Sequence, residues 1–196
     1  MEKKMYKKQM LVQRIVCFAT LAAAVLVFVY SLGLVTDLHY NNFAYYAEDP
    51  KNPTFDGANI YNEIQPFNQA LTTAGIILIL SSVLVFIFGS HSRRKYYIGN
   101  YITIGLNTLL SIGVSVWGIV NVIKYRAMYD QIDFEALEMW QNLLKMPYDI
   151  SPFWFDVGFY VFGIAIFVAI LGVLNLVFKV MVMKNEQQLL EEVSNG

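Results

Sequence analysis

The sequence predicts an all-α integral membrane protein, a bundle of four transmembrane helices. Of its 196 residues, 57% are apolar and only 15% are charged, whereas soluble domains carry about 25% charged residues. Four long runs contain no Asp, Glu, Lys or Arg, and each is about as long as the ~20 residues a helix needs to cross the hydrocarbon core. We expect one transmembrane domain over 1–196, with spans at about 12–35, 67–90, 98–123 and 155–179.

The first span resembles a signal peptide at its start, but we expect it to be retained. Residues 1–14 are basic, and Ala22, Ala23 and Ala24 could mimic a cleavage site. The apolar run nevertheless continues to Val35, which exceeds the roughly 7–15 residues of a signal-peptide apolar region.

The basic residues predict that both termini are cytoplasmic. Ten Lys or Arg residues lie in the N-terminal segment, in the short turn at 91–97, at Lys179 and in the tail at 180–196. The two longer loops contain four. Lys and Arg accumulate on the cytoplasmic side of membrane proteins. The turn is therefore cytoplasmic, and loops 36–66 and 124–154 are outer loops. The residues that anchor the turn are Arg93, Arg94 and Lys95.

The outer loops are too aromatic and too patterned for plain linkers. Tyr and Phe side chains crowd the first loop; they form either an aromatic belt at the headgroups or a surface for a partner, and the belt is the commoner arrangement. In the second loop, Asp130 and Asp133 are candidate N-caps for an amphipathic helix over about 134–146. Its candidate partner contacts are Leu137, Trp140 and Leu144.

A polar stripe runs along the third span. Asn107, Ser111 and Ser115 recur every four residues, which places them on one helix face. With Asn121, and Asn175 of the fourth span, they could line a hydrated path. The favoured alternative is packing, because interhelical hydrogen bonds commonly join transmembrane helices, and the fourth span has small residues that permit close approach.

The sequence predicts no catalytic, cofactor-binding or metal site. His39 and His91 lie on opposite sides of the predicted membrane, and neither begins an H-E-x-x-H pattern. The near-neutral net charge of −1 gives no support for nucleic-acid binding. Cys17 is the only cysteine, and Asn52-Pro53-Thr54 is a blocked glycosylation sequon. These two observations favour a bacterial plasma membrane over a eukaryotic cell surface.

Four spans with two outer loops resemble tetraspanins and claudins in outline. The cysteine signatures of those families are missing from both outer loops, so no property is carried over from either. We expect a non-enzymatic accessory or assembly subunit of a larger membrane complex, such as a transporter. The expected partners are the lipid bilayer and a membrane protein or a second copy of the chain. The alternative is a small channel or solute carrier acting as an oligomer.

Overall fold

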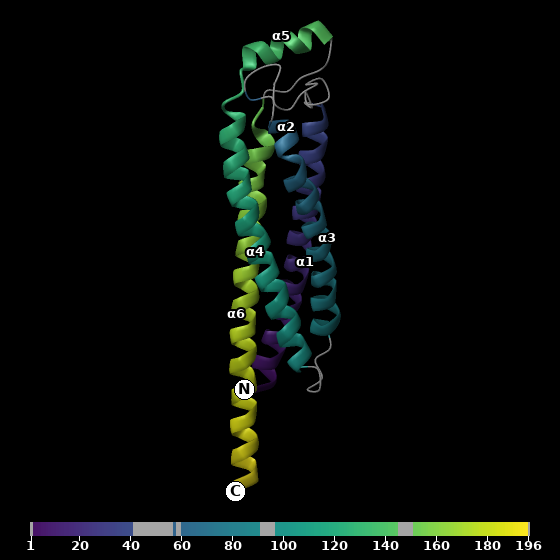
Figure 1. The fold of residues 1–196 in the computed structure, drawn as a ribbon. Helices are drawn as coiled ribbons and strands as arrows, with labels where there is room; N and C mark the ends of the chain where they lie inside the picture. The colour runs from purple at the N-terminus through teal and green to yellow at the C-terminus, as the bar shows by residue number, and fades with distance from the viewer. Residues whose placement is uncertain (1, 41–56, 58–59, 91–96, 145–150, 196) are drawn as a thin grey trace. The chain divides into compact units, whose positions relative to one another are not determined.

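The chain is all-helical over the residues that the computed structural model describes, which are 2–40, 57, 60–90, 97–144 and 151–195. Those residues contain no strand. Figure 1 labels the helices in chain order. They are α1 (Glu2–Tyr40), α2 (Ile60–Glu63), α3 (Gln65–Ser90), α4 (Tyr97–Tyr129), α5 (Phe134–Leu144) and α6 (Phe153–Asn195).

Four of these helices are long and apolar enough to cross a membrane, which confirms the predicted class of fold. The candidate spans are Lys7–Leu34, Gln65–Gly89, Ile98–Tyr129 and Phe153–Asn185. The helices continue past the apolar runs because a helix satisfies its own backbone hydrogen bonds in water as well as in lipid. Helix α4 thus passes through Lys124 and Arg126, which the sequence placed in a loop.

The chain divides into two compact units, and each of the four long helices contributes one segment to each unit. Unit 1 consists of Met1–Val25, Ile77–Gly113 and Ile164–Gly196. Unit 2 consists of Leu26–Ile76 and Val114–Gly163. The short helices α2 and α5 belong to unit 2.

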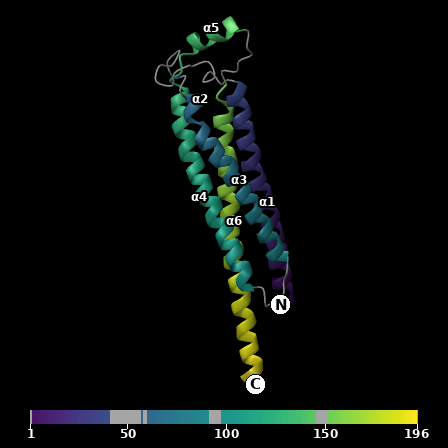
Figure 2. The same cartoon turned by 45° about the vertical axis from the view of Figure 1, so that its right-hand side comes forward.

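The interior of unit 1 is rich in polar side chains. A small apolar cluster of Cys17, Val85 and Ile104, with Leu176 packed against it, joins all four helices. Buried polar residues of the same unit are Gln9, Gln13, Thr20, Ser82, Asn100, Asn107, Thr108, Ser111, Asn175 and Lys179. Within this unit, α6 continues past the end of α1 that carries the N-terminus (Figure 2).

Unit 2 is held together by aromatic side chains. Phe67 of α3 packs on Trp117 and Tyr125 of α4, with ring centroids 5.0 Å and 5.6 Å apart. Tyr30 of α1 makes an edge contact with Phe162 of α6 at 5.6 Å. These rings fill the space between four helices with large apolar surfaces, which is where aromatic side chains contribute most to packing.

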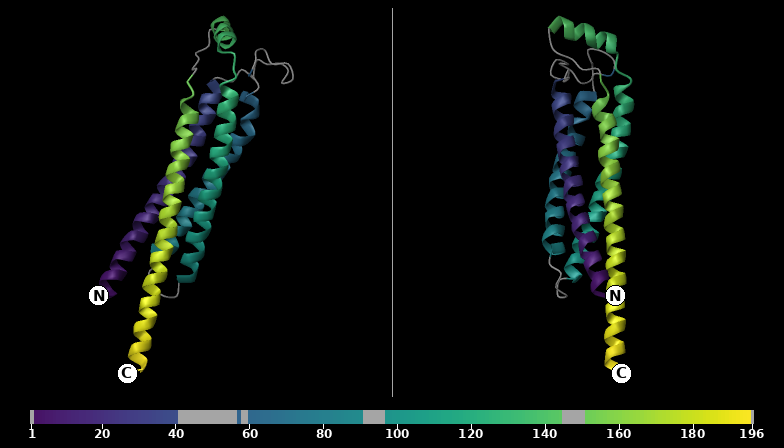
Figure 3. Two further views of the ribbon diagram at one scale, coloured as in Figure 1. Left: turned by 90° about the vertical axis from the view of Figure 1, so that its left-hand side faces the viewer. Right: turned by 180° about the vertical axis from the view of Figure 1, so that it is seen from behind.

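Helix α5 lies across the helix ends of unit 2 (Figure 3). Its first turn is capped as the sequence predicted, because the backbone N–H of Ala136 donates to Oδ1 of Asp133 at 3.0 Å. Leu137 is only 1% exposed, and the ring of Phe134 contacts that of Tyr129 at 5.4 Å. The helix is therefore packed on its own chain through one edge.

Candidate functional site

Asn107, the most buried amide of the predicted stripe on α4, connects helices. Its Nδ2 donates to Oγ of Ser81 at 2.7 Å and to Oγ of Ser82 at 3.2 Å. Ser82 in turn donates to the carbonyl of Thr20 on α1 at 3.4 Å. One chain of hydrogen bonds thus joins α4, α3 and α1 inside unit 1, and this arrangement favours the packing interpretation of Asn107.

The other members of the stripe have different surroundings. Ser111 and Asn175 are buried in unit 1, and Ser115 is buried in unit 2. Asn121, also in unit 2, is half-buried and donates to the carbonyl of Trp117 in its own helix at 2.8 Å. The hydroxyl of Ser115 and both amide atoms of Asn175 find no hydrogen-bond partner in the part of the chain that the structure describes.

Replacing Asn107 with leucine should lower the stability of the bundle by about 1–2 kcal/mol, since an interhelical hydrogen bond of this kind contributes on that order and two serine hydroxyls lose their donor. The measurement is thermal unfolding in detergent. The matched control is Asn121→Leu on the same helix, which should change stability by less than about 0.5 kcal/mol because, among the described residues, Asn121 bonds within α4. A fully folded Asn107→Leu protein that loses a measurable solute flux would support a pore instead.

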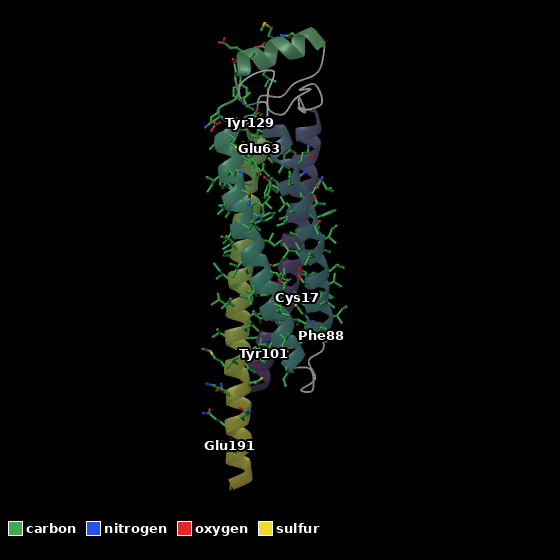
Figure 4. The ribbon with its side chains drawn as sticks, in the orientation of Figure 1. Cys17, Glu63, Phe88, Tyr101, Tyr129 and Glu191 are labelled. Atoms are coloured by element: carbon green, nitrogen blue, oxygen red, sulfur yellow. The ribbon has the colours of Figure 1, made fainter. Side chains whose placement is uncertain are left out.

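A second polar cluster, which the sequence did not reveal, surrounds Lys179 of α6. This lysine is 4% exposed, and its Nζ lies 3.4 Å from Oε1 of Gln13 on α1. The ammonium also lies 5.2 Å from the ring centroid of Tyr101 on α4, close enough for a cation–π interaction. Figure 4 labels three residues of unit 1: Tyr101 on α4, Cys17 on α1 and Phe88 on α3.

Gln13 is fixed on both sides of its amide. Its Nε2 donates to the carbonyl of Gly89 at 2.7 Å, and its Oε1 accepts from Nε2 of Gln9 at 2.9 Å. Gly89 has no side chain to obstruct this approach: a Cβ there would lie 3.1 Å from the Gln13 amide nitrogen and 2.9 Å from the Cys17 sulfur. The cluster is therefore a network of contacts across the four helices α1, α3, α4 and α6. It depends on Gln13, whose partners Gly89 and Lys179 are remote in sequence.

Unit 2 carries a small ionic network beside α5. Nη1 of Arg126 on α4 lies 2.9 Å from Oδ1 of Asp156 on α6, and its Nε lies 3.4 Å from Asp130. The hydroxyl of Tyr125 donates to the carbonyl of Glu63 at the end of α2 at 2.9 Å. Exposed ion pairs of this kind contribute little stability, so we interpret them as fixing positions between helix ends.

Of the remaining predicted site residues, the structure describes only some. Leu137 is buried against its own chain, while the side chains of Trp140 and Leu144 lie outside the described set. The anchors Arg93, Arg94 and Lys95 also lie outside the described residues. No group of three or more His, Cys, Asp or Glu that could hold a metal ion occurs in the described part of the chain.

Comparisons with protein-family models, with curated proteins and with solved structures find no match. The class of protein therefore follows from the helices themselves. Four helices of this length and apolarity indicate a multi-pass membrane protein with a helical bundle.

Proposed function

We propose that the protein is a non-enzymatic accessory or assembly subunit of a larger membrane complex. The observation that carries the proposal is the folded cap of unit 2, which we define as α2, α5, Gly57 and Asp130–Asp133. A Cβ on Gly57, whose φ is +84°, would lie 2.8 Å from the Ile132 backbone, so Gly57 packs against Ile132 as closely as glycine allows. Ile132 and Leu137 are both buried.

Among its described residues, the cap exposes the acidic side chains of Glu63, Glu135 and Glu138. Unit 2 contains eleven Asp or Glu and four Lys or Arg, for a net charge of −7. Unit 1 contains four Asp or Glu and ten Lys or Arg, for a net charge of +6. On α5 itself, Glu135, Glu138 and Met139 are exposed. Exposed carboxylates on described helices suit recognition of another protein, because complementary charge steers and orients association.

The same division of charge supports the proposed orientation. Cations favour the cytoplasmic side, so unit 1, with both termini, would face the cytoplasm of a plasma membrane, which we propose to be bacterial. The acidic cap of unit 2 would then be outside the cell, where α5 could meet the outer part of a partner.

The proposal is tested by photo-crosslinking in cells together with flux measurements in liposomes. A photoreactive phenylalanine at Met139, which is 70% exposed on α5, should yield one discrete adduct with another membrane protein. The same photoreactive phenylalanine in place of Leu109, which is 68% exposed on the apolar face of α4, should yield no such adduct. Purified protein should leave liposomes as tight to ions and small solutes as empty ones.

The alternative is a small channel or solute carrier that acts as an oligomer. Asn175 favours it, since a buried amide without a partner among the described residues is a typical lining group of a hydrated path. Flux above that of empty liposomes, without an adduct at Met139, would replace the accessory role with this alternative.

A further inference from the structure

The cations of unit 1 whose side chains the structure describes are of two kinds. Lys7, Lys8, Arg14 and Lys184 are exposed, as expected for residues that anchor a bundle at a membrane surface. Lys179 differs because it is 4% exposed and lies inside a candidate span. A cation buried in a membrane bundle is costly and commonly marks a binding site or pathway.

We propose that unit 1 binds a phosphate-class anion at a site between Asn175 and Lys179 on the inward face of α6, opposite Gln13. Asn175 is 1% exposed, and neither its Nδ2 nor its Oδ1 has a hydrogen-bond partner among the described residues. An amide buried in this way costs free energy unless a bound molecule satisfies it. The amide N–H and the ammonium are both donors, to which an anion is complementary, and Oδ1 can accept from a hydroxyl group of the same ligand.

The helix geometry directs both groups to one place. Asn175 and Lys179 are four residues apart, so their Cβ atoms lie about 5–6 Å apart on the same face. Side chains in a helix lean toward its N-terminus, which carries the long lysine stem back over the turn of Asn175. The ammonium and the amide therefore flank a common position inside unit 1.

The wall opposite this position is already fixed. Gln13 is held by Gly89 and Gln9 as described above. The hydroxyl of Tyr101 donates to the sulfur of Met183 at 3.1 Å, which holds the ring beneath the lysine. A site with fixed walls loses little conformational entropy when a ligand binds.

Phosphate chemistry fits this donor set best. Two neighbouring donors can each bond a different oxygen of one phosphate group, and lysine is a common phosphate ligand. Phosphate is supplied by lipid headgroups at the surface of the bilayer and by free inorganic phosphate, and the two sources share this chemistry.

The test uses the full-length protein, purified and delipidated in an uncharged detergent. The probes are inorganic phosphate, followed by isothermal titration, and short-chain phosphatidylglycerol, followed by native mass spectrometry. The wild type should bind one equivalent of at least one probe. Lys179→Met should weaken that binding at least tenfold. Its matched control, Lys184→Met, removes an exposed cation of the same helix and should weaken binding less than twofold.

A second variant keeps the test decisive if Lys179→Met does not fold. Asn175→Asp preserves the side-chain volume and can pair with Lys179, and its negative charge should weaken phosphate binding at least tenfold. Binding of phosphatidylglycerol alone identifies a lipid headgroup as the ligand, and binding of inorganic phosphate identifies the free anion. The proposal is overturned if the wild type binds neither probe, if Lys184→Met loses as much binding as Lys179→Met, or if Asn175→Asp binds like the wild type. None of these outcomes depends on the accessory role proposed above.

Discussion

Replacing Gly118 with alanine should lower the thermal stability of the bundle, although alanine is the better helix former. An added Cβ would lie 2.5 Å and 2.7 Å from Cε1 and Cε2 of Phe162, well inside normal contact. Phe162 is fully buried, and its ring is held edge-on by Tyr30 at 5.6 Å. Tyr30 cannot yield readily, because its hydroxyl lies against the backbone position of Gly158.

We expect Gly118→Ala to destabilise the protein by about 1–3 kcal/mol, the usual cost of overpacking a core. The matched control is Gly113→Ala, five residues earlier on α4, where an added Cβ meets nothing within 4 Å. That change should leave stability unchanged or raise it by up to about 1 kcal/mol, from helix propensity. Unfolding in detergent measures both. Equal stability of the two variants would contradict the close contact between α4 and α6 in unit 2.

The spans could be predicted from sequence because they depend on a local property. A run without charges identifies a candidate transmembrane helix wherever it lies, and the basic turn separates α3 from α4 without ambiguity. The N-cap of helix α5 was also predictable, since Asp133 accepts from a backbone N–H only three residues away. Helix ends were less predictable, and α4 continues to Tyr129 because nothing in the residues after Ile123 interrupts its hydrogen bonding.

The polar interior of unit 1 could not be predicted in the same way. Lys179 follows a charge-free run and therefore resembles the cytoplasmic end of a span. Its burial depends on Gln13, which is 166 residues away in the sequence. A partial signal was present: Gln9, Gln13 and Cys17 recur every four residues on α1, and Asn175 precedes Lys179 by the same spacing on α6. Such spacing places residues on one face but does not identify what that face contacts.

The orientation of the chain should give an all-or-none result in cysteine labelling. In a Cys17→Ala background, Gln131→Cys should react with a membrane-impermeant maleimide on intact cells, whereas Asn185→Cys should react only after permeabilisation. Both positions are exposed and uncharged, so neither substitution alters the distribution of charge under test. The physical reason is the excess of cations in unit 1, since a membrane potential of 100 mV opposes the outward transfer of each by about 2.3 kcal/mol.

Cys17 itself provides the control for access. It is 3% exposed, so the otherwise unchanged protein should stay unlabelled under both conditions and react only after denaturation. Labelling of Asn185→Cys on intact cells, with Gln131→Cys protected until permeabilisation, would reverse the orientation. The acidic cap of unit 2 would then face the cytoplasm, and any partner of α5 would have to be sought there, because the charge of the cap can attract a partner only on its own side of the membrane.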